Sequence, residues 1–270
     1  MVALLTNSSI AGNGGGKKSC RNYEYKPLKI QQMTNEAIQI DNPQSPACFL
    51  PHVIGCLSFF NADNLEIMRG FKDNEFDLAI VDPPYGIERF KKPSGKTRFK
   101  SSKLMQEEGL TWDNKPTAEY WNELFRISRN QIVWGANNFT MPPSEYFLIW
   151  NKKQTVDNFA SAEYAWVSMG LKKPAKVYEY GIHKHNAITK IHPTEKPVDL
   201  YQFIIKHYVN ENEKILDTHL GSGSIAVAIE MANRLDKMNL KFVGIEIDKE
   251  YFEKALNRIE QYCRQGTLFF

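Results

Sequence analysis

The residues with the clearest chemical potential lie in FDLAIVDPPYG, residues 76–86. The first six are mostly apolar and predict a buried strand, which runs directly into Asp82, Pro83, Pro84 and Tyr85. A strand often ends at a proline, because proline has no N–H to donate to a neighbouring strand. Two consecutive prolines also restrict the backbone, so the acid and the aromatic ring would be held rigidly. The stretch is therefore either a stiff end to a strand or a rigid support for reactive groups.

A glycine loop in LDTHLGSGSIAVAIE is the second such stretch. Asp217 ends a predicted strand, and Gly221 and Gly223 let the backbone bend sharply and lie close to a ligand. Glu246 ends the next predicted strand, 25 residues after Gly221, where a βαβ unit brings an acid to ribose hydroxyls. The third glycine of a dinucleotide loop would be residue 226, which is alanine, and no partner for a pyrophosphate is evident. An adenosyl ligand without phosphates fits as well, and the alternative is a tight turn followed by a solvated glutamate.

Predicted strands and helices alternate along most of the chain. Strands are expected at 56–60, 76–81, 131–135, 146–150, 161–169, 214–217 and 241–248, and helices within 61–71, at 117–129, at 197–209, within 221–232 and at 249–263. Residues 170–193 are basic and are expected to be irregular. Alternation of this kind indicates a mainly parallel α/β sheet, on which ligands bind beyond the carboxyl ends of strands. That rule selects the residues after Val81, Leu216 and Ile245.

Composition limits the class of protein. The chain has 270 residues and 42% of them are hydrophobic, enough for one large domain or two small ones. No run of about 18 apolar residues predicts a membrane span, and the first ten residues make a poor signal peptide, so no membrane partner is expected. The four cysteines form no CxxC pair, and His183 and His185 have no cluster of Cys or carboxylates near them. We therefore expect no metal site and a reducing cytosol.

Three motifs together carry a resemblance to a known family. DPPYG, HPTEKP and DTHLGSGS resemble motifs of amino-group DNA methyltransferases that depend on S-adenosylmethionine. DPPY resembles the catalytic motif, whose first residue is commonly Asp in the adenine-N6 branch, and the glycine loop resembles the FxGxG cofactor motif. The catalytic motif comes first here, an order that resembles the circularly permuted class β. The resemblance covers about residues 53–262 and implies a Rossmann-like α/β fold with helices on both faces of the sheet.

The expected organisation follows from this resemblance. Residues 1–48 have the composition of a flexible extension, 49–263 would form the catalytic domain, and 264–270 would form a tail. Insertions at about 86–110 and 170–193 would contact DNA. The region between DPPY and HPTEKP is short, so any part that recognises the target sequence must be small.

The resemblance implies S-adenosylmethionine as the cofactor. Asp217, Gly221 and Gly223 would surround its methionine part, and Glu246 would accept hydrogen bonds from its ribose. His219 stands where the motif has an aromatic residue, and a flat imidazole is a departure that leaves its packing role open.

Three more residues match positions near the cofactor in that family. Asp63 matches the acid beside the adenine amino group, with a helix N-cap as the alternative. Thr194 and Lys196 match the segment that borders the cofactor, and a helix cap is also the alternative for Thr194.

The resemblance implies that DPPY presents a base amine to the methyl donor. Such an amine is a poor nucleophile because its lone pair is delocalised into the ring. Asp82 and the carbonyl of Pro83 offer acceptors for its two N–H bonds, which should favour a pyramidal nitrogen, and Tyr85 offers a stacking face for a flipped base. Asp at this position favours adenine, since cytosine-N4 enzymes usually have Ser. Cytosine-N4 methylation, adenine-N6 methylation of RNA and a non-catalytic nucleic-acid-binding relative stay open.

A basic stretch that leaves directly from DPPYG is the predicted contact with double-stranded DNA. Opposed only by Glu88, it contains Arg89, Lys91, Lys92, Lys96, Arg98, Lys100 and Lys103. Such a run is often only a solvated loop, but its attachment to DPPYG favours phosphate contacts.

The tail RQGTLFF raises one further partner. Gln265, Leu268 and Phe269 resemble the Q-x-x-L-F pattern of ligands of bacterial sliding clamps. The alternative is an apolar tail that packs on its own domain.

Overall fold

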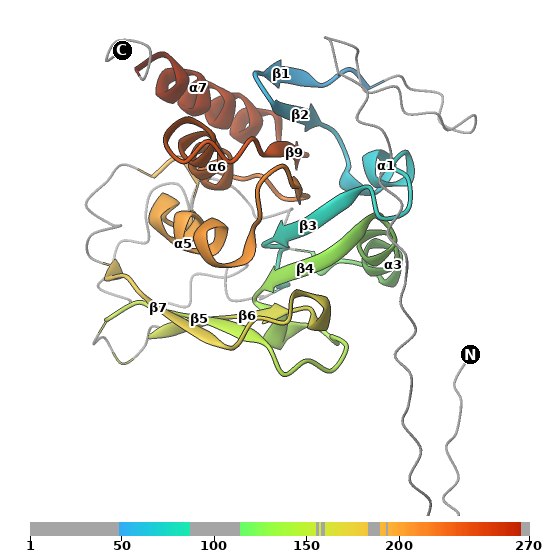
Figure 1. Cartoon of the computed structure of the whole chain (residues 1–270). Helices are drawn as coiled ribbons and strands as arrows, with labels where there is room; N and C mark the ends of the chain where they lie inside the picture. The colour runs from blue at the N-terminus through green and yellow to red at the C-terminus, as the bar shows by residue number, and fades with distance from the viewer. Residues whose placement is uncertain are drawn as a thin grey trace, which may run out of the picture. The chain divides into compact units, whose positions relative to one another are not determined.

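A single mixed sheet organises the structure. The computed structural model describes residues 49–86, 114–154, 157, 160–182, 190–192 and 194–265 of the chain. Within these ranges the strands are His52–Ile54 (β1), Leu57–Asn61 (β2), Phe76–Val81 (β3), Ser128–Trp134 (β4), Phe147–Asn151 (β5), Ala162–Val167 (β6), Lys176–Glu179 (β7), Lys214–Asp217 (β8) and Lys241–Glu246 (β9). Their order is β1-β2-β9-β8-β3-β4-β6-β5-β7 (Figure 1). Only β1 and β6 run antiparallel to the strands beside them, so the sheet is mainly parallel, as predicted.

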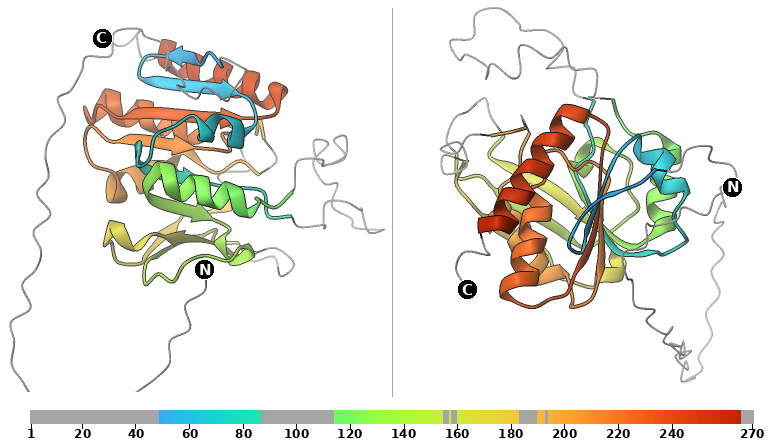
Figure 2. Two further views of the ribbon diagram at one scale, coloured as in Figure 1. Left: turned by 90° about the vertical axis from the view of Figure 1, so that its right-hand side faces the viewer. Right: turned by 90° about the horizontal axis from the view of Figure 1, so that it is seen from above.

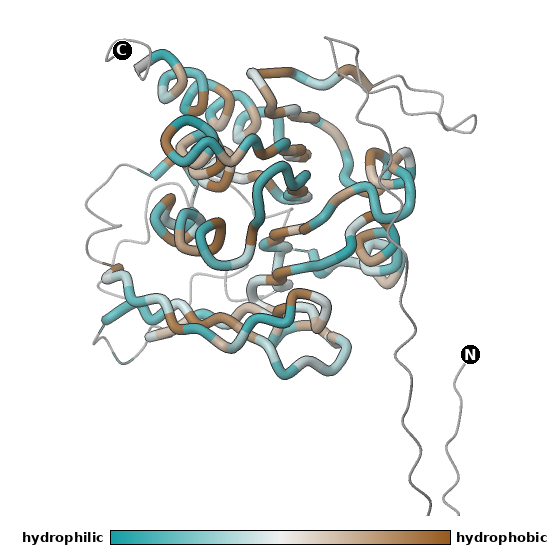
Figure 3. Tube along the Cα trace, viewed as in Figure 1, coloured by the Kyte–Doolittle hydropathy of each residue, from teal (hydrophilic) through white to brown (hydrophobic). Residues whose placement is uncertain are grey.

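Helices cover both faces of this sheet, which confirms the predicted layering. One face carries α1 (Asn64–Arg69) and α3 (Ala118–Ile127), and the other carries α5 (Val198–Tyr208), α6 (Ser224–Leu235) and α7 (Lys249–Gln265), as Figures 1 and 2 show. Leu78 and Ile80 pack toward α5 and α6, whereas Ala79 and Val81 pack toward α1 and α3, because side chains alternate along a strand. Hydrophobic and hydrophilic residues alternate along the helices (Figure 3), which is typical of helices with one buried face. Across the described ranges, no helix combines the length and apolarity that a membrane span requires.

One prediction of secondary structure is wrong. Residues 170–193 were expected to be irregular, but Lys176–Glu179 form β7, which pairs in parallel with β5. Val177 and Tyr178 suit a strand, and lysines are frequent on edge strands, so the basic composition concealed it. The helix predicted at 117–129 is confirmed as α3, although it ends at Ile127, because β4 begins at Ser128, whose Oγ donates to the carbonyl of Leu124. β1 is a further short strand that the sequence analysis misses.

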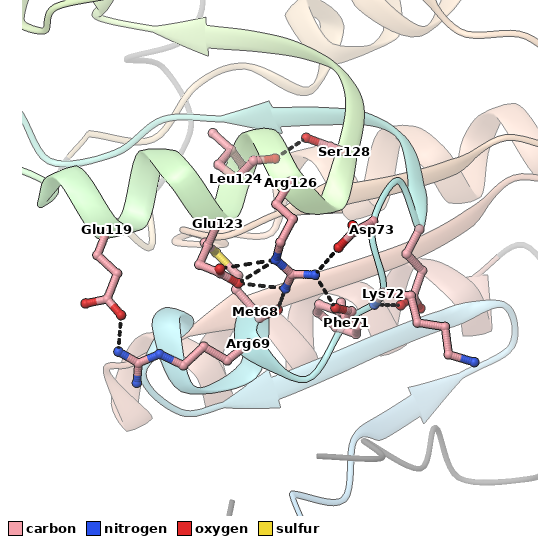
Figure 4. A network of polar contacts seen from close by, with 11 residues as sticks. Met68, Arg69, Phe71, Lys72, Asp73, Glu119, Glu123, Leu124, Arg126 and Ser128 are labelled. Atoms are coloured by element: carbon pink, nitrogen blue, oxygen red, sulfur yellow. Dashed lines mark hydrogen bonds and ion pairs between the residues drawn. The ribbon is translucent and has the colours of Figure 1, made fainter. Parts of the chain in front are cut away.

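Arg126 joins α1 to α3 at the edge of the sheet where β3 and β4 begin (Figure 4). Its guanidinium donates to the carbonyl of Met68 at 3.1 Å and to that of Phe71 at 2.8 Å. These carbonyls lie at the end of α1, where helical partners run out. Ion pairs with Glu123 at 2.7 Å and Asp73 at 2.8 Å complete the network. Arg126 thus connects the segments that lead into β3 and β4, at the amino ends of both strands.

The DPPY motif and the glycine loop meet where β3 and β8 lie side by side. Leu78 of β3 pairs with Ile215 of β8, so Asp82 and Asp217 extend to the same edge of the sheet. The next described helix after β3 is α3 on one face, while β8 leads to α6 on the other (Figure 1). Connections therefore leave the sheet in opposite directions at this boundary, which is the switch point at which open α/β sheets bind ligands. The chain reaches it first through DPPY and later through the glycine loop, the predicted permuted order.

Candidate active site

Asp82 is the first residue beyond β3, and two donors hold its carboxylate. The Tyr85 hydroxyl donates to Oδ1 at 2.6 Å, and Lys196 donates from Nζ to Oδ2. Lys196 comes from HPTEKP, just before α5, so this contact joins the two motifs. The side chain of Asp82 keeps 18% of its surface exposed, so these partners do not enclose it completely.

Gly135, directly after β4, makes room for the ring of Tyr85. Its φ is +64°, and a Cβ placed on it would lie 2.0 Å from Cε1 of the ring. The left-handed backbone and the ring therefore both exclude a side chain here. The N–H of Gly135 donates to the carbonyl of Tyr164 at 2.9 Å, which keeps this backbone in place. Burial, with the charge of Asp82, raises the pKa of the Tyr85 hydroxyl, so it stays a donor at neutral pH.

Lys196 is buried between two carboxylates. Its side chain is 4% exposed; Nζ pairs with Asp82 and lies 3.3 Å from Oε2 of Glu163. The ring centre of Trp134 is 5.4 Å away. Burial alone would lower the pKa of Lys196, but the charges of Asp82 and Glu163 raise it above its ordinary value. The sequence analysis places this lysine at the cofactor; the structure shows its ammonium on Asp82, and contact with a cofactor stays a prediction.

The glycine loop turns sharply between β8 and α6 and contacts Glu246. Gly221 and Gly223 have φ of +51° and +70°, which residues with a side chain rarely adopt. The N–H of Gly221 donates to Oε2 of Glu246 at 2.8 Å. A Cβ on Gly223 would lie 3.1 Å from Cδ1 of Ile259 and 3.3 Å from Cβ of Ala255, so α7 packs directly on this glycine. The loop is thus a sharp backbone turn beside an acid, and its role as a cradle for a cofactor stays a prediction.

Acidic side chains dominate the surroundings of this cradle. Asp217 is buried, and its Oδ1 accepts the N–H of His219 at 2.9 Å. Burial raises the pKa of Asp217 to about 8 and also raises the pKa of Glu246. A cationic ligand would favour the ionised form of both carboxyls, whereas a pyrophosphate would be repelled. These two acceptors therefore fit an adenosyl ligand with a positive charge, such as S-adenosylmethionine, better than a dinucleotide.

Asp63 and Thr194 have partners within the protein. Oδ1 of Asp63 accepts the N–H of Leu65 at 2.9 Å and that of Glu66 at 3.2 Å, so this residue is the N-cap of α1, the alternative that the sequence allows. Thr194 Oγ1 lies 3.1 Å from Nδ1 of His192. Among the described residues no side chain caps α5, so a helix cap is the wrong alternative for Thr194. Binding of the cofactor by either residue stays a prediction.

His219 packs beside the glycine loop as a neutral ring. Burial lowers its pKa to about 3. Its ring centre is 5.4 Å from that of Tyr120, and Nε2 is 3.1 Å from Nδ2 of Asn64. The imidazole thus joins the glycine loop to α1 and α3, and its predicted packing near the cofactor stays a prediction.

Arg258 of α7 clamps HPTEKP to the glycine loop. Its guanidinium pairs with Oε1 of Glu195 at 3.1 Å. The same Nη1 donates to the carbonyl of Ser222 and to Oγ of Ser224, each at 3.1 Å. One arginine therefore fixes the distance between the two predicted cofactor segments.

Comparison with known proteins agrees with this geometry. The N6/N4 methyltransferase family, described as DNA methylase, matches residues 127–257, which include HPTEKP and the glycine loop. The Type II methyltransferase M.BglII of Bacillus subtilis is 25% identical over 277 residues, covering 77% of this chain and 75% of the relative. The Type II methyltransferase M2.LlaDCHI of Lactococcus lactis subsp. cremoris is 25% identical over 253 residues, covering 76% and 90%. These matches support a DNA methyltransferase of the N6/N4 class.

Among solved structures, the M1.HpyAVI–SAM complex is similar to this methylase with a TM-score of 0.48 and 20% identity. The similarity covers 75% of this chain and 99% of that one.

Several predicted contacts of the methylase fall outside the described residues. They are the DNA-contacting Arg89, Lys91, Lys92, Lys96, Arg98 and Lys100, and the tail residues Leu268 and Phe269 with the side chain of Gln265. Of the second predicted insertion, the structure describes 170–182 and 190–192. Within the ranges that the structure covers, no three His, Cys, Asp or Glu side chains are grouped to hold a metal ion.

Gly135, Glu163 and Arg258 are the parts of the methylase site that sequence reasoning misses. Gly135 carries a usable signal, because it follows a predicted strand just as the two recognised motifs do. Glu163 and Arg258 carry none, since a single charge in a strand or a surface helix usually faces solvent.

Proposed function

We propose that this DNA methylase transfers a methyl group from S-adenosylmethionine to the exocyclic N6 of adenine at a specific site in double-stranded DNA. The observation that carries the proposal is the placement of Asp82 and Tyr85 beyond β3, beside the glycine loop of β8. An acceptor with a stacking ring next to a nucleoside cradle is what transfer to a base amine requires. The cytosol of a bacterium or phage-infected host would be its place of action.

The residues around the glycine loop would hold the cofactor. When bound, it supplies an electrophilic methyl group on a sulfonium. Asp217 and the backbone of Gly221 and Gly223 would line its methionine part. Glu246 already accepts N–H groups of Gly221 and Asp248, and a carboxylate can accept about four hydrogen bonds, which leaves capacity for a ribose hydroxyl.

Asp82 and Tyr85 would act on the target base. The carboxylate of Asp82 and the carbonyl of Pro83 accept the two N–H bonds of the amine, which localises the nitrogen lone pair toward the methyl group. Lys196 stabilises that carboxylate. The base must leave the duplex to reach this position, and stacking on Tyr85, about 1–3 kcal/mol, offsets part of the cost.

Asp at position 82 favours adenine over cytosine as the target. The decisive experiment incubates the full chain and labelled S-adenosylmethionine with double-stranded DNA, single-stranded DNA or RNA, followed by mass spectrometry of the nucleosides. We expect N6-methyladenine from double-stranded DNA. N4-methylcytosine, or N6-methyladenine from RNA alone, would contradict the proposed substrate, and no methylation of any substrate would point to a non-catalytic nucleic-acid-binding relative.

Asp82→Ala separates catalysis from cofactor binding. Loss of this acceptor should abolish methyl transfer, because the amine N–H bonds lose their carboxylate partner. Calorimetry should show S-adenosylmethionine binding close to wild type, since Asp82 lies across the β3–β8 boundary from the glycine loop. Loss of cofactor binding instead would mean that Asp82 belongs to the cofactor site.

Docking on a sliding clamp through Gln265, Leu268 and Phe269 is a separate prediction. The test compares clamp retention of the full chain with that of a chain lacking 264–270. Equal retention would contradict it and leave the methyl-transfer proposal unaffected.

A further inference from the structure

Glu163 reaches the active-site edge because β6 runs against its neighbours. The last pair between β4 and β6 joins Trp134 to Ala165. Residues before Ala165 therefore extend beyond the end of β4, toward the edge that carries Asp82. Its partner on β5 is the buried Trp150, and the Glu163 side chain keeps only 25% of its surface exposed, so its carboxylate is partly removed from water and is stabilised by pairing.

Four alternating charges run from β5 to Asp82. Lys152 Nζ lies 2.6 Å from Oε1 of Glu163, and Oε2 of Glu163 lies 3.3 Å from Nζ of Lys196, which binds Asp82. Burial alone would raise the pKa of Glu163, but the two lysines outweigh it and lower the pKa. Salt screens the interaction between partly buried charges only weakly, so a change of charge at Glu163 affects Lys196 and, through it, Asp82.

Glu163 gives Lys196 a second carboxylate partner. An ammonium with a single partner would direct its whole charge onto Asp82 and compete with the target amine for the same oxygens. With Glu163 present, the charge of Lys196 is shared and its position is set from two sides.

We propose, on the basis of the methyl transfer proposed above, that Glu163 is a positioning residue. It holds Lys196 so that Asp82 stays in place and can still accept an N–H bond of the target amine. The next residue, Tyr164, binds the N–H of Gly135, on which the Tyr85 ring lies. Glu163 and Tyr164, the second and third residues of β6, thus support the positions of the Asp82 carboxylate and the Tyr85 ring.

Two substitutions at Glu163 separate charge from volume. Glu163→Gln keeps the volume and removes the charge, whereas Glu163→Asp keeps the charge and removes volume. A positioning role through charge predicts that kcat falls about 10- to 100-fold in Glu163→Gln and clearly less in Glu163→Asp. A purely structural role predicts the reverse order, because the shorter side chain leaves a cavity.

The measurement is kcat at saturating DNA and S-adenosylmethionine, expressed per cofactor site titrated by calorimetry, so that unfolded protein does not count. The dissociation constant for the cofactor should stay within about twofold of wild type, because Glu163 acts on the amine side of the site. Glu179→Gln is the matched control. Glu179 lies on β7, which is separated from β6 by β5; it pairs with Lys153 at 2.5 Å and is 55% exposed, so its loss should leave kcat unchanged.

Three outcomes overturn the inference: wild-type kcat in Glu163→Gln, a larger loss in Glu163→Asp, or a loss confined to cofactor affinity. A wild-type chain that methylates no substrate would instead overturn the proposed function.

Discussion

Replacing Gly135 with alanine should lower kcat for methyl transfer strongly, by an amount that backbone strain alone does not explain. The new Cβ would lie 2.0 Å from Cε1 of Tyr85, whereas ordinary contact begins at 3.4 Å, so the ring must retreat by at least 1.4 Å. A misplacement of about 1 Å in a group that aligns reactants can cost about 100-fold in rate. We therefore expect kcat to fall about 100-fold, because Tyr85 no longer holds the base against Asp82.

Gly55 provides a matched control for the backbone strain. Its φ is +60°, close to that of Gly135, but no heavy atom lies within 4 Å of a Cβ placed there. Alanine in a left-handed conformation costs about 1–2 kcal/mol at either position. Urea unfolding should show at least that loss in both variants, while kcat falls only in Gly135→Ala.

The assay is initial-rate methyl transfer at saturating DNA and cofactor, with cofactor affinity from calorimetry. Affinity should be unchanged in both variants, because Gly135 follows β4, on the far side of β3 from the cradle. Equal kcat in the two variants would refute the reasoning that Gly135 positions Tyr85. Loss of cofactor affinity in Gly135→Ala would show that its effect lies in the other half of the site.

Three further substitutions test separate parts of the structure. Tyr85→Phe removes the hydrogen bond to Asp82 but keeps the ring, so kcat should fall only about 2- to 10-fold in methyl-transfer assays, and a complete loss would contradict stacking as the main role of Tyr85. Asp217→Asn should weaken cofactor binding in calorimetry but stabilise the free protein. In the folded wild type the pKa of Asp217 is about 8, above its unfolded value, so the wild type loses stability as pH rises from about 4 to 8. Urea unfolding should therefore show Asp217→Asn more stable than the wild type by up to about 5 kcal/mol at pH 8, with no difference near pH 4. A difference in stability that does not depend on pH would contradict the burial of Asp217. Arg126→Met leaves the carbonyls of Met68 and Phe71 without this donor and should lower the free energy of unfolding by about 2–3 kcal/mol with kcat per cofactor site unchanged; a specific loss of kcat would mean that the α1–α3 contact reaches the active site.

Local patterns predicted most of the elements and the edge at which they act. β2, β3, β5, β8 and β9 lie within a few residues of the expected strands, because apolar and β-branched runs are a local signal. The residues at strand ends, Asp82 and Glu246, lie where the rule for parallel sheets puts them. β7 was missed because its four residues, KVYE, are few and lie in a basic segment that has the composition of a loop.

These local patterns could not predict contacts between segments that lie far apart in the sequence. Lys196 lies 114 residues from Asp82 in the chain, and nothing in HPTEKP indicates that its ammonium binds the DPPY acid. Arg258 and Glu195 are likewise ordinary charges until α7 packs against the segment before α5. Pairing of this kind depends on how whole elements pack, which no local window of sequence contains.

The sequence by itself determined the chemistry at the site: a rigid acid and ring after one strand, a glycine cradle after another and an acid after a third. The tertiary structure decided which of these groups touch and what supports them. β3 lies beside β8 although more than a hundred residues separate them, and β6 runs antiparallel, so its first residues reach the active-site edge. Strand order and direction follow from burying both faces of the whole sheet at once, and for that reason Gly135 and Glu163 became part of the site only in the folded chain.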